Sequence, residues 1–209
     1  PIPDKTTIQN IIKENKKIED ERRPLLKEIE ELNNKLKELI SNSKGEEKPI
    51  SKLLISLEDK IVKIQERDYR KNGNIAIVSQ GGELISGYTN EEVEPIKKSL
   101  PVIVFGDHNK RVKYIDFPFV CGADGVRILK PNNEIKPKIF YYLLKYIDIF
   151  GDTKYSRHYK YLEKAKIKVP ESQDKLLENI EKIEEAIKEL DEKLEELEIK
   201  SKNILKRYL

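Results

Sequence analysis

The sequence has 209 residues, of which 38% are charged and 37% are hydrophobic. The charged fraction is well above the ~25% of an ordinary globular domain, so the whole chain cannot form one compact body. The length excludes a large multidomain enzyme. A single cysteine excludes a disulfide framework and a metal site built from several cysteines of one chain. Since no apolar run approaches the ~18 residues of a membrane span, we expect a cytoplasmic protein with no membrane association.

The net charge of +3 is distributed unevenly along the chain. Residues 1–50 have no net charge, because 11 basic side chains balance 11 acidic ones. Residues 51–170 contain 22 basic and 15 acidic side chains, a net charge of +7, whereas residues 171–209 contain 8 and 12, a net charge of −4. A basic central region of this kind indicates a polyanionic partner.

Two segments at the ends of the chain have a heptad pattern. Apolar residues alternate at spacings of three and four over residues 8–39 and again over residues 176–204, and most of the intervening residues are charged. The polar residues Asn15, Arg22 and Ser201 occupy positions in the same apolar frames. This pattern predicts two long helices, each of which buries a narrow stripe against a partner helix.

The position of these helices in the chain restricts how they can pair. The first leads into the central region and the second leads out of it, so the two run antiparallel if they pair with each other. The polar residues in the frames would then fix the register. Two alternatives are independent helices of a bundle and pairing with a second copy of the chain. Pro24 predicts an irregularity in the first helix, and the turn-rich residues 41–49 predict a linker.

The pattern changes to short β-rich runs in the central region. These runs are separated by Gly, Asn, Asp and Pro, and a helix is expected after them at residues 138–150. Together they predict an α+β domain with a curved sheet. The expected strands are residues 75–78, 100–105, 112–115, 119–121 and 126–129.

Four segments of the central region resemble the motifs of a known family. They are NIAIVSQGGELISGYT (74–89), LPVIVFGDHNKRVKYIDFPF (100–119), GADGV (122–126) and YSRHYK (155–160). In this order they resemble the target recognition domain of type I restriction-modification specificity subunits, and the two heptad helices resemble that family's paired helices. The resemblance covers residues 55–205. Similar recognition domains occur in type IIG restriction enzymes, so the motifs identify the DNA-reading module better than the class of system.

The resemblance implies an α+β fold, with one mixed α/β target recognition domain mounted on a long antiparallel two-helix coiled coil. Residues 1–48 would form the first helix and a linker, residues 49–169 the DNA target recognition domain, and residues 170–209 the second helix. It also implies a non-catalytic subunit that reads one half of a bipartite site in double-stranded DNA. Such a subunit docks the methyltransferase (modification) and restriction subunits.

The chain departs from the usual pattern of that family in one respect. A full specificity subunit has the order domain, helix, domain, helix, whereas this sequence has only helix, domain, helix. We therefore expect either the C-terminal portion of a longer subunit or a half-size subunit that forms a homodimer through the coiled coil.

A basic turn at residues 106–113 is the first candidate DNA-binding site. Arg and Lys side chains in loops neutralise phosphates or contact guanine, so the turn suits a DNA-binding protein. The alternative is a hairpin with a solvated charge cluster. For the neighbouring Asp107, a hydrogen bond that holds the turn is favoured over a catalytic dyad with His108, because no third catalytic group is apparent. The candidate residues are His108, Asn109, Lys110, Arg111 and Lys113.

A glycine-rich segment at residues 79–89 is the second candidate. Residues 82–87 have the spacing of a phosphate-binding loop, but Tyr88 stands where the essential Lys must be, so we reject nucleotide binding. The amide of Gln80 can contact adenine, and two glycines would let the backbone approach DNA closely. A base-reading loop and a structural turn both remain open. The candidate residues are Ser79, Gln80, Gly81, Gly82 and Tyr88.

The third candidate, at residues 154–160, alternates basic and aromatic side chains. Its basic residues could clamp phosphates. The alternative is the start of a helix whose aromatic residues pack on the core. The candidate residues are Lys154, Tyr155, Ser156, Arg157, His158 and Lys160.

Signatures of catalysis are missing from the sequence. It contains no amino-methyltransferase tetrapeptide, dinucleotide-binding loop, His/Cys metal cluster or nucleophile elbow. We therefore expect no catalytic residues, no metal and no cofactor, and we expect Cys121 to be an inert core residue. The alternative from another class is a coiled-coil scaffold whose central domain binds protein.

Overall fold

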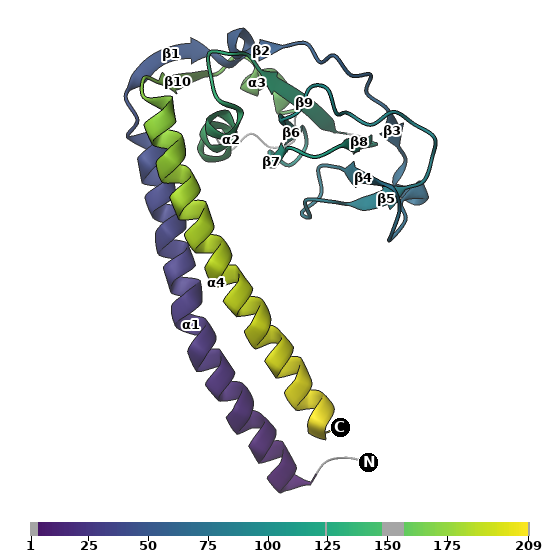
Figure 1. The fold of residues 1–209 in the computed structure, drawn as a ribbon, viewed down its shortest axis with the longest axis vertical. Helices are drawn as coiled ribbons and strands as arrows, with labels where there is room; N and C mark the ends of the chain where they lie inside the picture. Colours follow the sequence, from purple (N-terminus) through teal and green to yellow (C-terminus); the bar gives the residue numbers. More distant parts are fainter. Residues whose placement is uncertain (1–3, 124, 148–156, 209) are drawn as a thin grey trace. The chain divides into compact units, whose positions relative to one another are not determined.

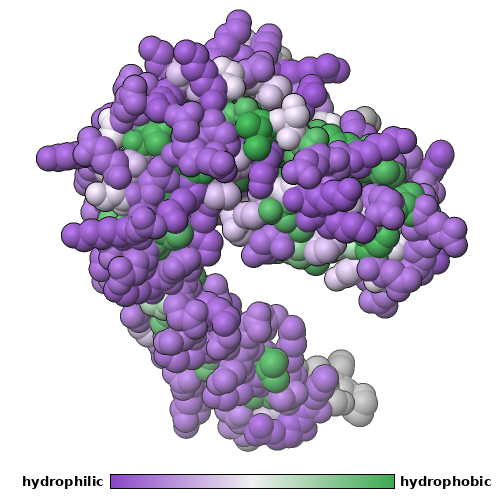
Figure 2. All heavy atoms as spheres, turned by 45° about the horizontal axis from the view of Figure 1, so that its top comes forward, coloured by the Kyte–Doolittle hydropathy of each residue, from purple (hydrophilic) through white to green (hydrophobic). Residues whose placement is uncertain are grey.

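The structure is a computed structural model that describes residues 4–123, 125–147 and 157–208. The chain divides into two compact units, Pro1–Leu39 with Leu177–Leu209, and Ile40–Leu176. We call the first unit the helical pair and the second the central domain. No helix in the described residues is both long and apolar enough to cross a bilayer. On the face shown in Figure 2 the surface is mainly hydrophilic, and hydrophobic side chains appear only in small separate areas.

The helical pair consists of α1 (Lys5–Ser41) and α4 (Gln173–Tyr208). The two helices lie side by side and run in opposite directions, with the start of α1 beside the end of α4 (Figure 1). Their heptad residues face each other, since Ile18, Leu197 and Ile204 are buried in one apolar cluster. The predicted antiparallel pairing of the two heptad segments within one chain is therefore confirmed.

A polar contact lies within this apolar stripe. The Ser201 hydroxyl donates to Asn15 Oδ1 at 2.8 Å, and Asn15 Nδ2 donates to the Ile11 carbonyl at 3.2 Å. The bond between Ser201 and Asn15 would be lost in any shifted pairing, so it favours this register at some cost in apolar burial. The Arg22 guanidinium binds Glu19 of the same helix at 2.7 Å.

We expect the replacement Ser201→Ala to destabilise the helical pair by about 1 kcal/mol, because Asn15 Oδ1 would lose its donor at a half-buried position. Thermal unfolding followed by the circular dichroism of the helices measures the change. Asn203→Ala, at an exposed position of the same helix, is the matched control and should have no comparable effect. Equal effects of the two replacements would contradict a role for the polar contact.

Helix α1 continues through Pro24 as a single helix, so the irregularity expected there does not interrupt it. A proline inside a helix removes the hydrogen bond to the carbonyl four residues before it, here that of Asp20. Both residues are exposed. Water can therefore hydrate the carbonyl, and the helix tolerates the proline.

In its described residues the central domain contains three sheets in place of the one curved sheet that we expected. The first has the order β2-β9-β6-β7, and all its neighbouring strands are antiparallel. The second has the order β3-β8-β4-β5, in which β8 runs parallel to both β3 and β4. The strands of the two sheets are β2 (Leu54–Ile55), β3 (Lys63–Ile64), β4 (Ile75–Val78), β5 (Gly87–Thr89), β6 (Val102–Gly106), β7 (Val112–Ile115), β8 (Phe119–Gly122) and β9 (Val126–Pro131).

The third sheet lies where a linker was expected. Residues Gly45–Pro49 form β1, which pairs antiparallel with β10 (Lys166–Pro170). This pairing joins the two segments by which the chain enters and leaves the central domain. A strand of this composition is hard to predict, because it contains two Glu, one Lys, one Gly and one Pro.

The core of the central domain lies on strands β6 and β8, in which every residue is buried. Val78, Val104 and Phe119 belong to one apolar cluster that joins strands of both larger sheets. Helix α2 (Pro137–Tyr146) packs against strands β6, β7 and β9 of the first sheet and buries Phe140. It ends before residue 150, and residues 148–150 of the expected helix lie outside the described residues.

The Asp59 carboxylate holds the segment before β6 in place. It accepts hydrogen bonds from the backbone N–H groups of Lys97 and Lys98, both at 3.1 Å, and of Ser99 at 2.7 Å. Burial acts to raise the pKa of Asp59, but a hydrogen bond with the Ser99 side chain and these backbone hydrogen bonds outweigh it and lower the pKa from 3.8 to about 2. The folded state therefore favours the charged carboxylate.

We expect Asp59→Asn to destabilise the protein by about 1–2 kcal/mol at neutral pH, because charge-assisted hydrogen bonds are lost. The native pKa lies below the unfolded value, so this stabilisation is present above pH 3.8 and is lost as the pH falls toward 2. Urea unfolding of both proteins between pH 7 and pH 2 measures the difference. Asp116→Asn, at an exposed position, is the control. A difference that stayed constant down to pH 2 would contradict this explanation.

Candidate nucleic-acid interface

The turn between β6 and β7 carries the first group of candidate residues. Its backbone is closed by a hydrogen bond from Gly106 N to the Arg111 carbonyl at 2.8 Å and by one from Lys110 N to the Gly106 carbonyl at 2.9 Å. Lys110 has a left-handed backbone with φ 62°, and Asn109 Oδ1 accepts from Arg111 N at 3.1 Å. The side chains of His108, Asn109 and Arg111 are exposed beyond the end of the sheet.

The glycine-rich segment after β4 is bound directly to this turn. Asn109 Nδ2 donates to the Gln80 carbonyl at 2.5 Å, and His108 N donates to Gln80 Oε1 at 3.4 Å. Within the segment, the Ser79 hydroxyl pairs with the Ser86 hydroxyl at 2.6 Å. Two of the three candidate groups therefore form one continuous surface.

Lys113 has a different role from the one we predicted. The residue is 8% exposed, and its ammonium donates to the carbonyls of Ser79 at 2.7 Å and Glu83 at 2.5 Å. Burial, with a smaller effect of the Arg111 charge, lowers the pKa of Lys113. This ammonium points into the protein and binds the glycine-rich segment. We therefore assign it to positioning the segment, and not to phosphate contact.

Glycines lie where these segments meet. A Cβ at Gly82 would lie 2.9 Å from Arg111 Nη1, so a larger residue there would displace the guanidinium. Gly125 has φ +71°, and a Cβ there would lie 2.5 Å from the His108 ring and 2.7 Å from the Gln80 amide. The glycine-rich segment, the turn between β6 and β7, and Gly125 can thus lie close together because Gly82 and Gly125 have no side chain.

Asp107 connects the third candidate group to the turn. Its carbonyl accepts from His158 N at 2.9 Å, and its carboxylate accepts from Tyr159 N at 2.8 Å, at the start of α3 (Tyr159–Leu162). The same carboxylate lies 3.6 Å from Arg127 Nε, and the residue is 3% exposed. We expected the Asp107 side chain to hold the turn between β6 and β7. Its carboxylate instead binds the start of α3, at Tyr159.

Several cations are left facing solvent by this arrangement. Arg111, Arg157 and Lys160 are exposed, and the Arg127 guanidinium lies over the Tyr159 ring at 5.2 Å. His158 does not join them, because it is 5% exposed. Burial and the Lys110 and His108 charges lower the pKa of His158, while Asp107 acts to raise it, so the environment favours the neutral imidazole. Our prediction of a DNA contact from His158 is thus replaced by a role in packing.

The structure does not bring every predicted residue to this surface. Tyr88 is half-buried in β5, where it pairs with Ala76 of β4 and bridges to Arg70. Lys154, Tyr155 and Ser156 lie outside the described residues. The sequence-based prediction missed Arg127, although a charged residue inside the apolar run 126–129 is a detectable signal, and the structure leaves it exposed. We call the surface formed by residues 79–82, 108–111 and 157–160 the recognition surface.

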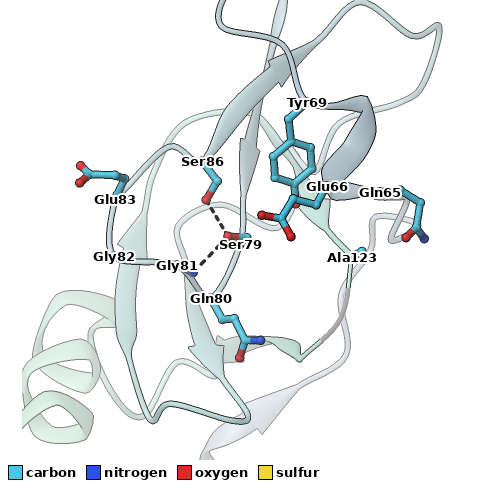
Figure 3. Close-up of a pocket in the computed structure, with 10 residues that line it drawn as sticks. All are labelled: Gln65, Glu66, Tyr69, Ser79, Gln80, Gly81, Gly82, Glu83, Ser86 and Ala123. Atoms are coloured by element: carbon cyan, nitrogen blue, oxygen red, sulfur yellow. Dashed lines mark hydrogen bonds between the residues drawn. The ribbon is translucent and has the colours of Figure 1, made fainter.

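A pocket of about 500 Å³ adjoins the recognition surface (Figure 3). It is bounded on one side by the glycine-rich segment and on the other by residues around a short 3-10 helix, Glu66–Asp68. Burial raises the pKa of Tyr69, one of the walls, and its hydroxyl interacts with the Ala123 backbone. The lining residues are Gln65, Glu66, Tyr69, Ser79, Gln80, Gly81, Gly82, Glu83, Ser86 and Ala123.

Two other kinds of site, a metal cluster and a reactive cysteine, can be checked in the described part of the chain. Among the residues that the structure describes, no three His, Cys, Asp or Glu side chains lie close enough to hold a metal ion. Cys121 is 1% exposed, and burial raises the pKa of its thiol to about 12, so the thiolate is not formed at neutral pH. Cys121 is thus a core residue, as we expected.

Comparison with known proteins gives structural matches only. No protein-family model and no curated protein matches the sequence. Among solved structures, the S subunit of a type I restriction-modification system from M. genitalium matches with a TM-score of 0.65 at 16% identity. The HsdS subunit from Thermoanaerobacter tengcongensis matches with a TM-score of 0.53 at 11% identity. A third solved structure, which concerns complex assembly and conformational transition of the type I R-M system, matches with a TM-score of 0.56 at 11% identity.

The chain has the fold of a type I restriction-modification S subunit. The match extends over 99%, 97% and 96% of this chain in the three comparisons. It therefore includes both the helical pair and the central domain. The α+β S-subunit fold that the sequence motifs led us to expect is confirmed, together with its coiled-coil helices. This chain spans only 61%, 57% and 57% of the lengths of the matched chains.

Proposed function

We propose that this chain is the DNA-recognition part of a type I specificity subunit, and that it binds one half of a bipartite site in double-stranded DNA. The recognition surface makes the contact. The observation that carries this proposal is the convergence of three segments, far apart in sequence, on one surface of a domain with the S-subunit fold.

The chemistry of the recognition surface suits two kinds of DNA contact. The exposed cations Arg111, Arg157 and Lys160 can neutralise phosphates, which supplies affinity that does not depend on sequence. The amide of Gln80 and the backbone of Gly81 and Gly82 lie beside them and can approach base edges in the major groove. Sequence-specific binding requires both.

The helical pair has a separate role in this proposal. Apart from its buried stripe, α4 carries mainly exposed Glu and Lys side chains, which suit a surface that docks modification and restriction subunits. Catalysis then belongs to those subunits, and this chain needs no active site. The second half-site is read by another recognition domain, either in the same longer polypeptide or in a second copy joined through the coiled coil.

The proposal is tested by measuring the affinity of the purified chain for labelled duplex DNA over a range of salt concentrations. Phosphate contacts release counterions, so we expect the logarithm of the binding constant to fall linearly with the logarithm of salt concentration, by about 0.9 per contact. A chain that binds protein through the same basic domain would have no affinity for duplex DNA at low salt. That result would contradict the proposal.

A further inference from the structure

The pocket beside the recognition surface contains an acidic group that phosphate binding does not explain. Glu66 and Glu83 both line it, and no ion pair joins either carboxylate to a cation in the described part of the chain. The neighbours of Glu66 pair with each other, since Arg67 Nε lies 3.7 Å from Asp68 Oδ2. Both carboxylates are exposed and can be hydrated, but a negative charge beside a DNA-binding surface weakens phosphate binding by repulsion, so its direction relative to the pocket matters.

The two carboxylates differ in direction. In Figure 3 the Glu66 carboxylate points toward Ser79, between the Tyr69 ring and the glycine-rich segment, whereas the Glu83 side chain points away from the other lining residues. The charge of Glu66 also acts on the Tyr69 hydroxyl, whose pKa it helps to raise after the larger effect of burial. Glu66 is thus the acidic group that is directed into the pocket.

The other polar groups of the pocket leave Glu66 as its main hydrogen-bond acceptor. The hydroxyls of Ser79 and Ser86 bind each other, and Ser79 Oγ also accepts from Gly81 N at 3.1 Å. Gln80 Oε1 is oriented toward His108 N. A group that comes close to Glu66 therefore meets a carboxylate that can only accept, so a hydrogen-bond donor is favoured at this point of the pocket.

The donors that a DNA duplex displays in its major groove are the exocyclic amino groups, N4 of cytosine and N6 of adenine. Carboxylates are the usual acceptors for the cytosine amino group. We propose that the pocket reads one amino-bearing base of the half-site, and that Glu66 accepts the hydrogen bond from the exocyclic amine. This inference rests on the proposed DNA-binding function. It adds a specificity-determining residue from a segment in which the sequence predicted no site.

The test uses the half-site that the wild-type chain selects from random duplexes. Each cytosine of that site is replaced in turn by 2-pyrimidinone and each adenine by purine, so that only the amino group is removed. At one position we expect the wild type to lose roughly 10- to 100-fold in affinity, the range of a good base-edge contact. The identity of that position distinguishes cytosine from adenine.

Glu66→Ala should bind the modified and unmodified duplexes equally at this position, and should bind non-specific DNA at least as tightly as the wild type, because a negative charge is removed. Glu66→Gln keeps the size and an acceptor oxygen, so it should keep part of the preference and shift it toward adenine, which a Gln amide contacts through two hydrogen bonds. Glu92→Ala removes an exposed carboxylate that does not line this pocket, and should change nothing.

The outcomes separate this inference from the proposed function. If the wild type selects a half-site but Glu66→Ala, folded by circular dichroism, keeps every base preference, the inference is wrong and the proposed function stands. If the wild type loses no affinity when any amino group is removed, the inference is also wrong. If the wild type selects no sequence, both fail.

Discussion

Asp107→Ala is expected to destabilise the central domain by about 2–3 kcal/mol, because a buried carboxylate that accepts from Tyr159 N and pairs with Arg127 is lost. The same replacement should weaken DNA binding, although Asp107 is too buried to touch DNA. Its carboxylate helps to hold residues 157–160 beside the turn, and without it the cations of these residues lose their fixed position relative to Arg111.

Two measurements check this expectation. Urea unfolding gives the stability, and binding of a labelled duplex at 25 °C, where the variant is still folded, gives the affinity. Asp107→Asn keeps an oxygen that can accept from Tyr159 N, so its affinity should be intermediate. Asp116→Ala, at an exposed position after β7, is the control for a lost charge. A variant that lost stability but kept full affinity would show that Asp107 supports only the fold.

The largest effect on binding is expected when Arg111, Arg157 and Lys160 are replaced together by alanine. Each phosphate contact makes the slope of log K against log salt more negative by about 0.9, so the loss of three should make it less negative by about 2.7. At 0.1 M salt each contact contributes roughly eightfold relative to 1 M, so three contribute roughly 500-fold. The three side chains are exposed, and their replacement should leave the stability nearly unchanged.

A matched triple variant removes the same amount of charge elsewhere. Lys182, Lys188 and Lys193 are exposed on α4, outside the central domain. Replacing them by alanine should leave the slope near its wild-type value, because they are not part of the recognition surface. Equal losses in the two triple variants would show that the chain attracts DNA by its overall charge, and would contradict a localised interface.

The sequence predicted those elements that carry a strong pattern of their own. The heptad residues identified both long helices, and the apolar runs gave β4 and β7 with their observed bounds. Strand β3 has only two residues, Lys63 and Ile64, and depends on its pairing with β8, which no local pattern reveals. The disruptive effect of Pro24 was overestimated. Pro24 is exposed, so water can compensate the lost hydrogen bond, and this exposure depends on the tertiary structure.

The sequence predicted which types of residue form the candidate site, but not the directions in which their side chains point. Arg111 and Lys113 are two residues apart, in the same basic run, and the sequence treats them alike. In the fold one is exposed, whereas the other points inward to two carbonyls. The link through Asp107 joins positions 52 residues apart, and the pocket draws on the segment around Glu66, where no motif was recognised. These features depend on long-range packing.

Selection of duplexes from a random pool by the purified chain shows whether it binds DNA in a sequence-specific way. The chain is expected to enrich one short sequence, bind it more tightly than a scrambled duplex of the same length, and lose most of that preference when Gln80 and Glu66 are replaced together by alanine. The absence of any enriched sequence, at a salt concentration where the chain still binds duplex DNA, would contradict the account.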